Sequence, residues 1–116
     1  MQIVVRNQTR NTVLADAAEL ADTPARRRTG LLKHDRLEPG QGLWIVPCES
    51  VHSFFMKFPI DLVYMDKQKK VRKVRHKMLP WRMSACFTAH SILELPAGAV
   101  ANSSTQKGDQ LVIEKY

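Results

Sequence analysis

The chain has 116 residues, of which 44% are hydrophobic and 25% are charged, and its net charge is +7. This length and composition are typical of one globular domain with a single core, here 1–116, and exclude a disordered segment or a disulfide-held miniprotein. No stretch of about 18 apolar residues occurs, so the sequence predicts no transmembrane helix and no membrane partner.

The first part of the chain is interrupted by charged residues at Arg6, Arg10 and Asp16. A signal peptide needs an unbroken apolar stretch, so we expect none and predict a cytoplasmic location. Cytoplasmic thiols are kept reduced, which disfavours a disulfide between the two cysteines.

The chain begins with a predicted β-hairpin, because β-branched residues in QIVVRN (2–7) and TVLA (12–15) flank a short turn. The next segment, 16–21, fits two structures. Asp16 and Glu19 have the spacing of a helix capping box, whereas the alternation of the segment fits a strand equally well.

A short helix is predicted within TPARRRTG (23–30). Thr23 is a favoured N-terminal cap, Pro24 suits the first helical position and Gly30 is a typical stop. We expect this to be the one short N-terminal helix of the domain, apart from a single helical turn in AGAVAN after Pro96.

Short apolar or alternating segments separated by turn signals make up most of the remaining chain. Such regular short strands are typical of an antiparallel β-sandwich or barrel, so the predicted fold is mainly β. The predicted strands are LWIVP (43–47), SFFMKF (53–58), IDLVYMD (60–66), KVRKVRHKM (70–78), SILELP (91–96) and QLVIEKY (110–116).

Five motifs occur in a fixed order along about 27–112. They are Arg27-x-x-Gly30-Leu31, Gly40-x-Gly42-Leu43, FFMKFPIDLVYMD, LELPAG and Gly108-Asp109. In this combination the sequence resembles the bacterial and archaeal family called domain of unknown function 192. The resemblance implies a compact, mainly β, sandwich-like or barrel-like domain with one short helix. It implies no activity, because the family has none assigned.

Two Cys-x-x-x-His pairs, Cys48 with His52 and Cys86 with His90, raise the question of a metal site. On a helix such a pair lies about 6 Å apart and can share a zinc ion, whereas on a strand it lies roughly 13 Å apart. Both pairs fall beside predicted strands, so we expect no metal and no other cofactor. The alternatives are a Cys2His2 zinc site and a disulfide between Cys48 and Cys86.

Charged residues also occur on strand faces that are otherwise partly apolar. Lys57, Asp61 and Glu94 are such residues, and charges rarely become buried unless they are paired. The favoured interpretation is a structural ion-pair network in which Lys57 or Arg27 neutralises the two carboxylates. The alternative is a small pocket that binds a ligand or moves a proton.

Basic residues cluster at 26–28 and along 67–77. A basic hairpin can lie against nucleic acid phosphates, but a lysine-rich turn also protects an edge strand. We expect nucleic acid binding to be weak and non-specific at most. The residues of the nucleic-acid alternative are Lys69, Lys70, Arg72, Lys73 and, for stacking, Trp81.

These patterns favour a non-catalytic binding or accessory module for an unknown protein or small ligand. Two alternatives remain: a small enzyme that uses a Lys/carboxylate pocket or a Cys/His metal site, and a nucleic-acid binder with a continuous basic face. A concave pocket that contains the charged residues would favour the enzyme.

Overall fold

A seven-stranded sheet dominates the computed structural model, which describes residues 2–115. The strand order in this sheet is β6-β5-β8-β3-β2-β1-β9, and β4 and β7 form a separate two-stranded sheet. The elements are β1 (Gln2–Asn7), β2 (Thr12–Ala21), α1 (Pro24–Thr29), β3 (Gln41–Ile45), β4 (Ser50–His52), β5 (Ile60–Met65), β6 (Val71–Met78), β7 (Met83–Ala85), β8 (Ser91–Pro96), α2 (Ala99–Asn102) and β9 (Leu111–Lys115).

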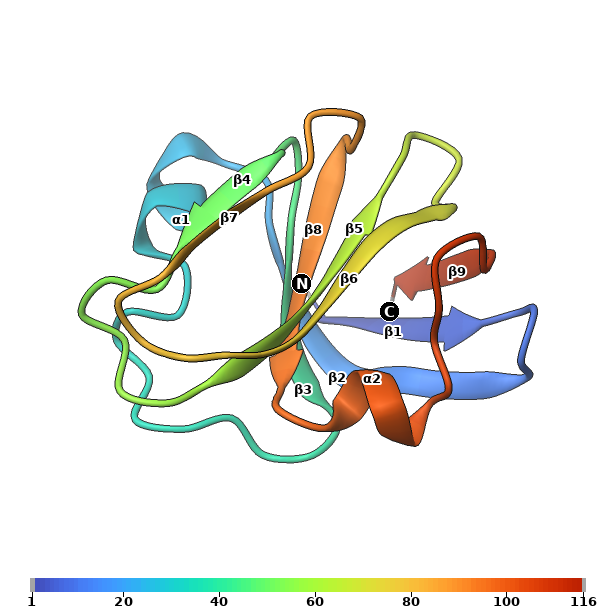
Figure 1. Cartoon of the computed structure of the whole chain (residues 1–116), viewed down its shortest axis with the longest axis horizontal. Helices are drawn as coiled ribbons and strands as arrows, with labels where there is room; N and C mark the ends of the chain where they lie inside the picture. The colour runs from blue at the N-terminus through green and yellow to red at the C-terminus, as the bar shows by residue number, and fades with distance from the viewer. Residues whose placement is uncertain (1, 116) are drawn as a thin grey trace.

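The large sheet curls into a half-barrel, as Figure 1 shows. The ends of its two edge strands meet at an isolated bridge between Lys70 and Gln110. Beside this bridge the amide of Val71 donates to the carbonyl of Asp109 at 2.8 Å. The mainly β fold expected from the sequence is therefore confirmed.

The sheet is not purely antiparallel, because β2 and β3 pair in parallel. A parallel pair needs a crossover connection, and α1 with the loop after it provides one here. The other described pairs of the sheet are antiparallel. Where β3 crosses close to β8, only glycine fits at position 42, since a Cβ there would lie 2.8 Å from the carbonyl oxygen of Glu94.

The helix α1 has the caps that its sequence predicts. The hydroxyl of Thr23 accepts from the amide of Arg26 at 3.2 Å, and Gly30 ends the helix with a φ of 50°. The description of an N-terminal helix is wrong, however, because α1 follows two strands. The undecided segment 16–21 belongs to β2, where pairing with both β1 and β3 overrides the local capping signal.

Residues 53–58 form turns, although the sequence predicted a strand there. The amide of Met56 donates to the carbonyl of Ser53, and Phe55 has a φ of 66°, so the backbone reverses direction. The last predicted strand, 110–116, corresponds to β9, except that residue 116 lies outside the described residues. The expected helical turn after Pro96 is α2.

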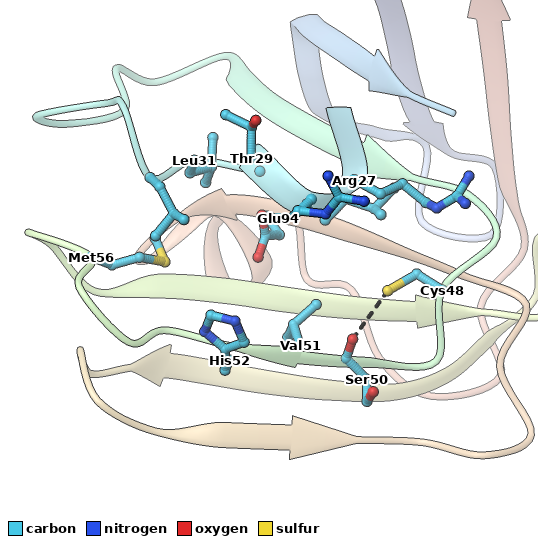
Figure 2. Close-up of a pocket in the computed structure, with 13 residues that line it drawn as sticks. Arg27, Thr29, Leu31, Cys48, Ser50, Val51, His52, Met56 and Glu94 are labelled. Carbon is cyan, nitrogen blue, oxygen red and sulfur yellow. Dashed lines mark hydrogen bonds between the residues drawn. The ribbon is translucent and has the colours of Figure 1, made fainter. Parts of the chain in front are cut away.

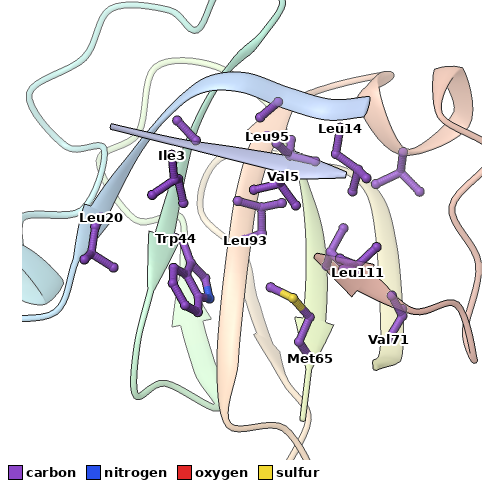
Figure 3. Packing of buried hydrophobic residues seen from close by; sticks show 14 residues of the cluster. Ile3, Val5, Leu14, Leu20, Trp44, Met65, Val71, Leu93, Leu95 and Leu111 are labelled. Atoms are coloured by element: carbon purple, nitrogen blue, oxygen red, sulfur yellow. The ribbon is translucent and has the colours of Figure 1, made fainter. Parts of the chain in front are cut away.

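Two hydrophobic clusters pack on opposite faces of the large sheet. The first fills the inside of the curl and includes Val63, Met65 and Leu95 (Figure 3). The second lies on the outer face and includes Leu62 and Tyr64. Every residue of β5 is buried, because alternate side chains enter alternate clusters.

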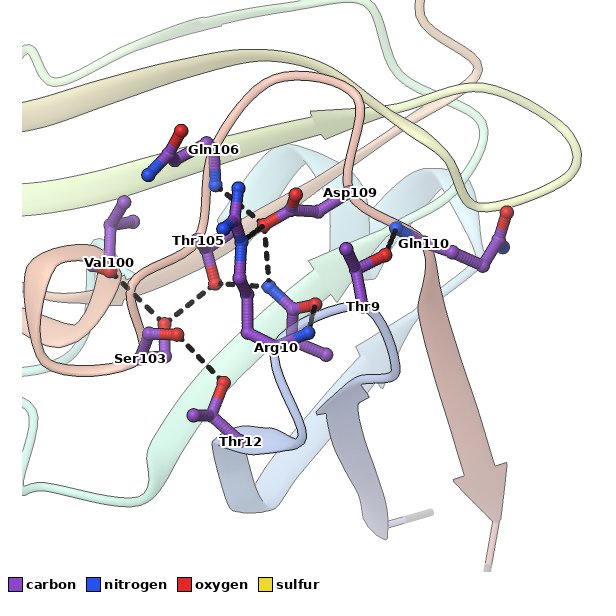
Figure 4. A network of polar contacts seen from close by, with 10 residues as sticks. Thr9, Arg10, Thr12, Val100, Ser103, Thr105, Gln106, Asp109 and Gln110 are labelled. Carbon is purple, nitrogen blue, oxygen red and sulfur yellow. Dashed lines mark hydrogen bonds and ion pairs between the residues drawn. The ribbon is translucent and has the colours of Figure 1, made fainter.

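A buried polar network holds the hairpin of β1 and β2 to the segment before β9, as Figure 4 shows. The amide group of Asn7 donates to Thr105 at 3.0 Å and to Asp109 at 2.9 Å, and Arg10 forms an ion pair with Asp109. Burial alone would raise the pKa of Asp109, but hydrogen bonds from Asn7, Arg10 and the amide of Gln106 lower it below its usual range. Asp109 of the Gly108-Asp109 motif thus joins the segment before β9 to the first hairpin.

Candidate functional site

A pocket of about 170 Å³ opens on the outer face of the sheet, between α1, the turn that follows it and β4 (Figure 2). The centre of β8 contributes one residue, Glu94. The other lining residues are Arg27, Arg28, Thr29, Gly30, Leu31, Leu32, Ile45, Cys48, Ser50, Val51, His52 and Met56.

The wall on the side of α1 carries both charge and apolar surface. Arg27 is half-buried, and its guanidinium donates to the carbonyl of Asp22 at 3.1 Å, which fixes the side chain. Arg28 is exposed. After the turn at Gly30 the chain re-enters the fold, and Leu31 packs into the outer cluster with 3% exposure.

Glu94 is the most unusual residue of the pocket. It is 3% exposed, and its strand pairs with β3 on one side and β5 on the other. Burial raises the pKa of its carboxyl group to about 7. Within residues 2–115 no hydrogen bond or ion pair to this carboxyl group is found, and in Figure 2 it points toward the space bordered by Met56, His52 and Val51.

Two of the four predicted Cys/His residues, Cys48 and His52, line this pocket. The thiol of Cys48 donates to the carbonyl of Ser50 at 3.1 Å, and burial raises its pKa. His52 accepts a hydrogen bond from the amide of Phe54 through Nδ1. These contacts give Cys48 and His52 separate backbone partners.

Cys86 and His90 do not line the pocket. The thiol of Cys86 lies 3.4 Å from the hydroxyl of Thr88, and both cysteines carry free thiols. In the described part of the chain, no three His, Cys, Asp or Glu side chains are grouped as a metal site requires. The expectation that the protein binds no zinc stays a prediction.

The predicted group of Arg27, Lys57, Asp61 and Glu94 is not brought together. Arg27 and Glu94 share the pocket, but Lys57 is exposed and its Nζ lies 2.7 Å from Asp35. Lys57 does not face Arg27 and Glu94, because 53–58 forms turns rather than the predicted strand.

Asp61 is fully buried and serves as a backbone anchor. Its two carboxyl oxygens accept three backbone hydrogen bonds at 2.8 to 3.0 Å, from Lys77, Gly98 and Val100. Two of these amides belong to the start of α2, so Asp61 ties that helix to β5. The Pro-Ile-Asp and Pro-Ala-Gly motifs therefore meet in one structural contact.

The basic residues predicted for nucleic acid have different partners in the structure. Lys69 lies over the ring of Trp44 at 5.8 Å, and Arg72 lies 3.9 Å from Asp66, near the turn between β5 and β6. Lys73 instead reaches across to β7, where its Nζ donates to the carbonyl of Ala85. Lys70 takes part in the bridge that joins the sheet edges.

Sequence reasoning missed Arg28, Leu31 and Met56 as pocket residues. Gly30-Leu31 was visible as a motif, but only the fold shows that it forms a pocket wall. None of the helices within residues 2–115 has the length and apolar character needed to cross a membrane.

The sequence motifs belong to a known protein family. A family described as uncharacterised, domain of unknown function 192, matches residues 4–113. The chain belongs to this family. The family match extends further toward the N-terminus than the motifs themselves, and it includes most of β1 and all of β2.

Curated relatives in the domain of unknown function 192 family are named UPF0127 proteins. The protein from Thermococcus sibiricus is 28% identical over 111 residues, which cover 90% of this chain and 71% of that protein. The protein from Pyrococcus abyssi is 28% identical over 115 residues, which cover 93% of this chain and 95% of that protein. Neither name states an activity.

Two crystal structures share the fold. One, from Sinorhizobium meliloti, is described as a "putative transcription regulator"; its TM-score is 0.83 at 19% identity, over 96% of this chain and 91% of that chain. The other, a protein of unknown function from Novosphingobium aromaticivorans, has a TM-score of 0.79 at 18% identity, over 97% of this chain and 84% of that chain. At these identities the likeness establishes the fold alone.

Proposed function

We propose that this chain is a non-catalytic binding module that holds a small ligand in the pocket at Glu94. The observation that carries the proposal is the Glu94 carboxyl group, which is buried at the pocket wall with no hydrogen bond or ion pair from residues 2–115. The Glu94 oxygens border the pocket rather than being fully enclosed, and a largely buried carboxyl group in that position is stabilised by a hydrogen-bond donor. A ligand that donates a hydrogen bond to Glu94 would supply it.

The lining residues restrict the class of ligand. The cavity, at about 170 Å³, is smaller than the pockets that hold drug-sized molecules, which supports a small metabolite. Glu94 selects an amine or hydroxyl donor, Leu31 and Met56 suit a short apolar body, and the charges of Arg27 and Arg28 favour an acidic group. We therefore assign the ligand to small molecules with a hydrogen-bond donor at one end and an acid at the other.

Thermal unfolding in the presence of amino acids, amino alcohols, amines and short carboxylic acids tests this proposal. A compound present at ten times its Kd adds about 1.4 kcal/mol to the free energy of unfolding, which raises Tm by about 6 °C. The Glu94→Gln variant should lose most of this shift, whereas Glu38→Gln, at an exposed glutamate outside the pocket, should keep it. An equal shift in Glu94→Gln, or no shift with any compound of the panel, would contradict the proposal.

A second candidate function, general acid-base catalysis, is favoured by the pKa of Glu94. A carboxyl group with a pKa of about 7 can give or accept a proton near neutral pH. Against this, no hydrogen bond joins Cys48 to His52 among residues 2–115, as a nucleophile and its base would require. Conversion of a bound compound by the wild-type protein and not by Glu94→Gln, followed by NMR, would favour the enzyme.

We also infer that the module acts in the cytoplasm. The free thiols of Cys48 and Cys86 support this location, since glutathione keeps cytoplasmic cysteines reduced.

A further inference from the structure

Two neighbouring turns expose aromatic side chains that contact one another. Phe55 and Trp81 are 71% and 56% exposed, and their ring centroids lie 4.7 Å apart in an edge-to-face arrangement. Phe54 extends this group, since its ring stacks on Trp81 at 5.9 Å and on His52 at 4.9 Å. Large apolar side chains gathered in this way are typical of a binding surface, unlike apolar residues scattered singly.

The two turns are held together by Ser53, which is fully buried. Its hydroxyl donates to the carbonyl of Leu79 at 2.7 Å and accepts from the amide of Arg82 at 2.9 Å. The amide of Trp81 donates to the Ser53 carbonyl at 3.0 Å.

The backbone at both exposed aromatic residues adopts an unusual conformation. Phe55 has a φ of 66° and Trp81 a φ of 67°, a region that bulky residues seldom occupy. Such strain persists only where the surrounding structure enforces it, and it is concentrated at functional sites. The hydrogen bonds of Ser53 hold the backbone of the two turns together, so both rings project from the same part of the surface.

Two arginines bind backbone carbonyls of the segment 80–83 that carries Trp81. The guanidinium of Arg82 contacts the carbonyls of Pro80 and Trp81 at 3.4 Å, and Arg75 donates to the carbonyl of Met83 at 2.7 Å. Lys73 reaches Ala85 further along β7, as described above.

The hydrogen-bond partners of these residues are backbone carbonyls, and Lys73 Nζ also lies 5.5 Å from the centroid of the Tyr64 ring. Lys73, Arg75 and Arg82 have no acidic ion-pair partner within residues 2–115. We name Phe55, Lys73, Arg75, Trp81 and Arg82 the aromatic-basic surface.

We propose that the aromatic-basic surface binds single-stranded nucleic acid. Unpaired bases would stack on Trp81 and Phe55, and phosphates would lie beside Lys73, Arg75 and Arg82. Single strands combine exposed base faces with regularly spaced negative charge, which matches exposed rings together with unpaired cations. In a duplex the base faces are hidden in the stack. The five residues of this surface do not line the Glu94 pocket, although Phe54 stacks on both Trp81 and the pocket residue His52. The proposal therefore rests on other residues than the function proposed above.

Fluorescence anisotropy with a short labelled oligothymidylate tests the stacking contact. Asparagine is tolerated at positive φ, so Trp81→Asn and Phe55→Asn remove the rings with little added backbone strain. We expect Trp81→Asn to weaken binding about 5- to 100-fold. Phe87→Asn is the matched control, because Phe87 is 78% exposed and takes no part in the stacked group.

The salt dependence of binding tests the cations. Arg75→Gln and Arg82→Gln should each lower the slope of log K against log salt concentration by about 0.7. Lys107→Gln, at an exposed turn elsewhere, should leave the slope unchanged. Circular dichroism of each variant is the control that checks that it is folded.

The wild-type protein provides a test that needs no substitution. Trp81 is exposed and Trp44 is buried, so oligothymidylate that stacks on the surface should quench tryptophan fluorescence from Trp81. Absence of quenching, or equal loss of binding in Trp81→Asn and Phe87→Asn, would overturn the proposal. Tighter binding to duplex DNA or to phosphatidylglycerol vesicles than to oligothymidylate would also overturn it.

Discussion

Replacing Glu94 with glutamine should remove a pH dependence that the buried carboxyl group imposes on stability. The folded protein raises the pKa of Glu94 from 4.5 to about 7. Between these values the folded state binds more protons than the unfolded chain, so the free energy of unfolding falls as pH rises. The loss begins near pH 4.5 and is complete somewhat above pH 7.

The size of the effect follows from the pKa change. Each pKa unit corresponds to about 1.4 kcal/mol, so the ionised form of Glu94 costs about 3 kcal/mol relative to the protonated form. Glutamine has a similar shape and stays neutral. Glu94→Gln should therefore match the wild type within about 1 kcal/mol at pH 4.5, and exceed its stability by about 3 kcal/mol at pH 8.

Urea unfolding at several pH values between 4.5 and 8 measures this difference. Glu38→Gln is a suitable control, because Glu38 is exposed and pairs with Arg36 at the surface. Parallel stability profiles for the wild type and Glu94→Gln would refute the reasoning. That result would mean that the Glu94 carboxylate has a partner in solution, and the basis of the proposed ligand site would be lost.

Three other outcomes are expected. Asp61→Ala should lower the free energy of unfolding by about 3 kcal/mol in denaturant melts, because one buried and two partly buried amides lose their acceptor. A change near zero would show that these amides do not depend on Asp61. The lowered pKa of Asp109 gives stability that is present above pH 3.8 and lost as pH falls through the folded-state value. In Asp109→Asn the free energy of unfolding should therefore depend less on pH in this acid range. An acid unfolding transition equal to that of the wild type would argue against the network. Elemental analysis should find no stoichiometric metal, and one zinc per chain would contradict this expectation. Thiol titration should find both Cys48 and Cys86 reactive without reductant, and the absence of free thiols would contradict it.

Features set by neighbouring residues could be predicted from the sequence. Thr23, Pro24 and Gly30 locate α1 because capping depends on hydrogen bonds within a few residues. Turn residues and β-branched runs likewise located most strands. The family motifs were also visible, although their physical reasons, such as the close approach at Gly42, appear only in the structure.

Features set by distant residues could not be predicted in this way. Segment 53–58 alternates like a strand, yet contacts between Ser53 and the turn at 79–82 make it a turn. The parallel pairing of β2 with β3 depends on a crossover that no local pattern reveals. The pocket joins residues from α1, β4 and β8, so no single segment carries its signature.

The contrast between Asp61 and Glu94 shows how the register of two strands sets the environment of each carboxyl group. Alternation places each carboxylate on a known face of its own strand, but only the pairing of β5 with β8 relates the two faces. Asp61 lies opposite Leu95 and Glu94 lies opposite Leu62, so the two carboxylates occupy opposite sides of the sheet. Asp61 meets three backbone amides and is fully satisfied, whereas Glu94 meets an open pocket with none. A one-residue shift of β8 against β5 would place Glu94 on the same face as Asp61, and the Glu94 carboxyl group would then no longer face the pocket.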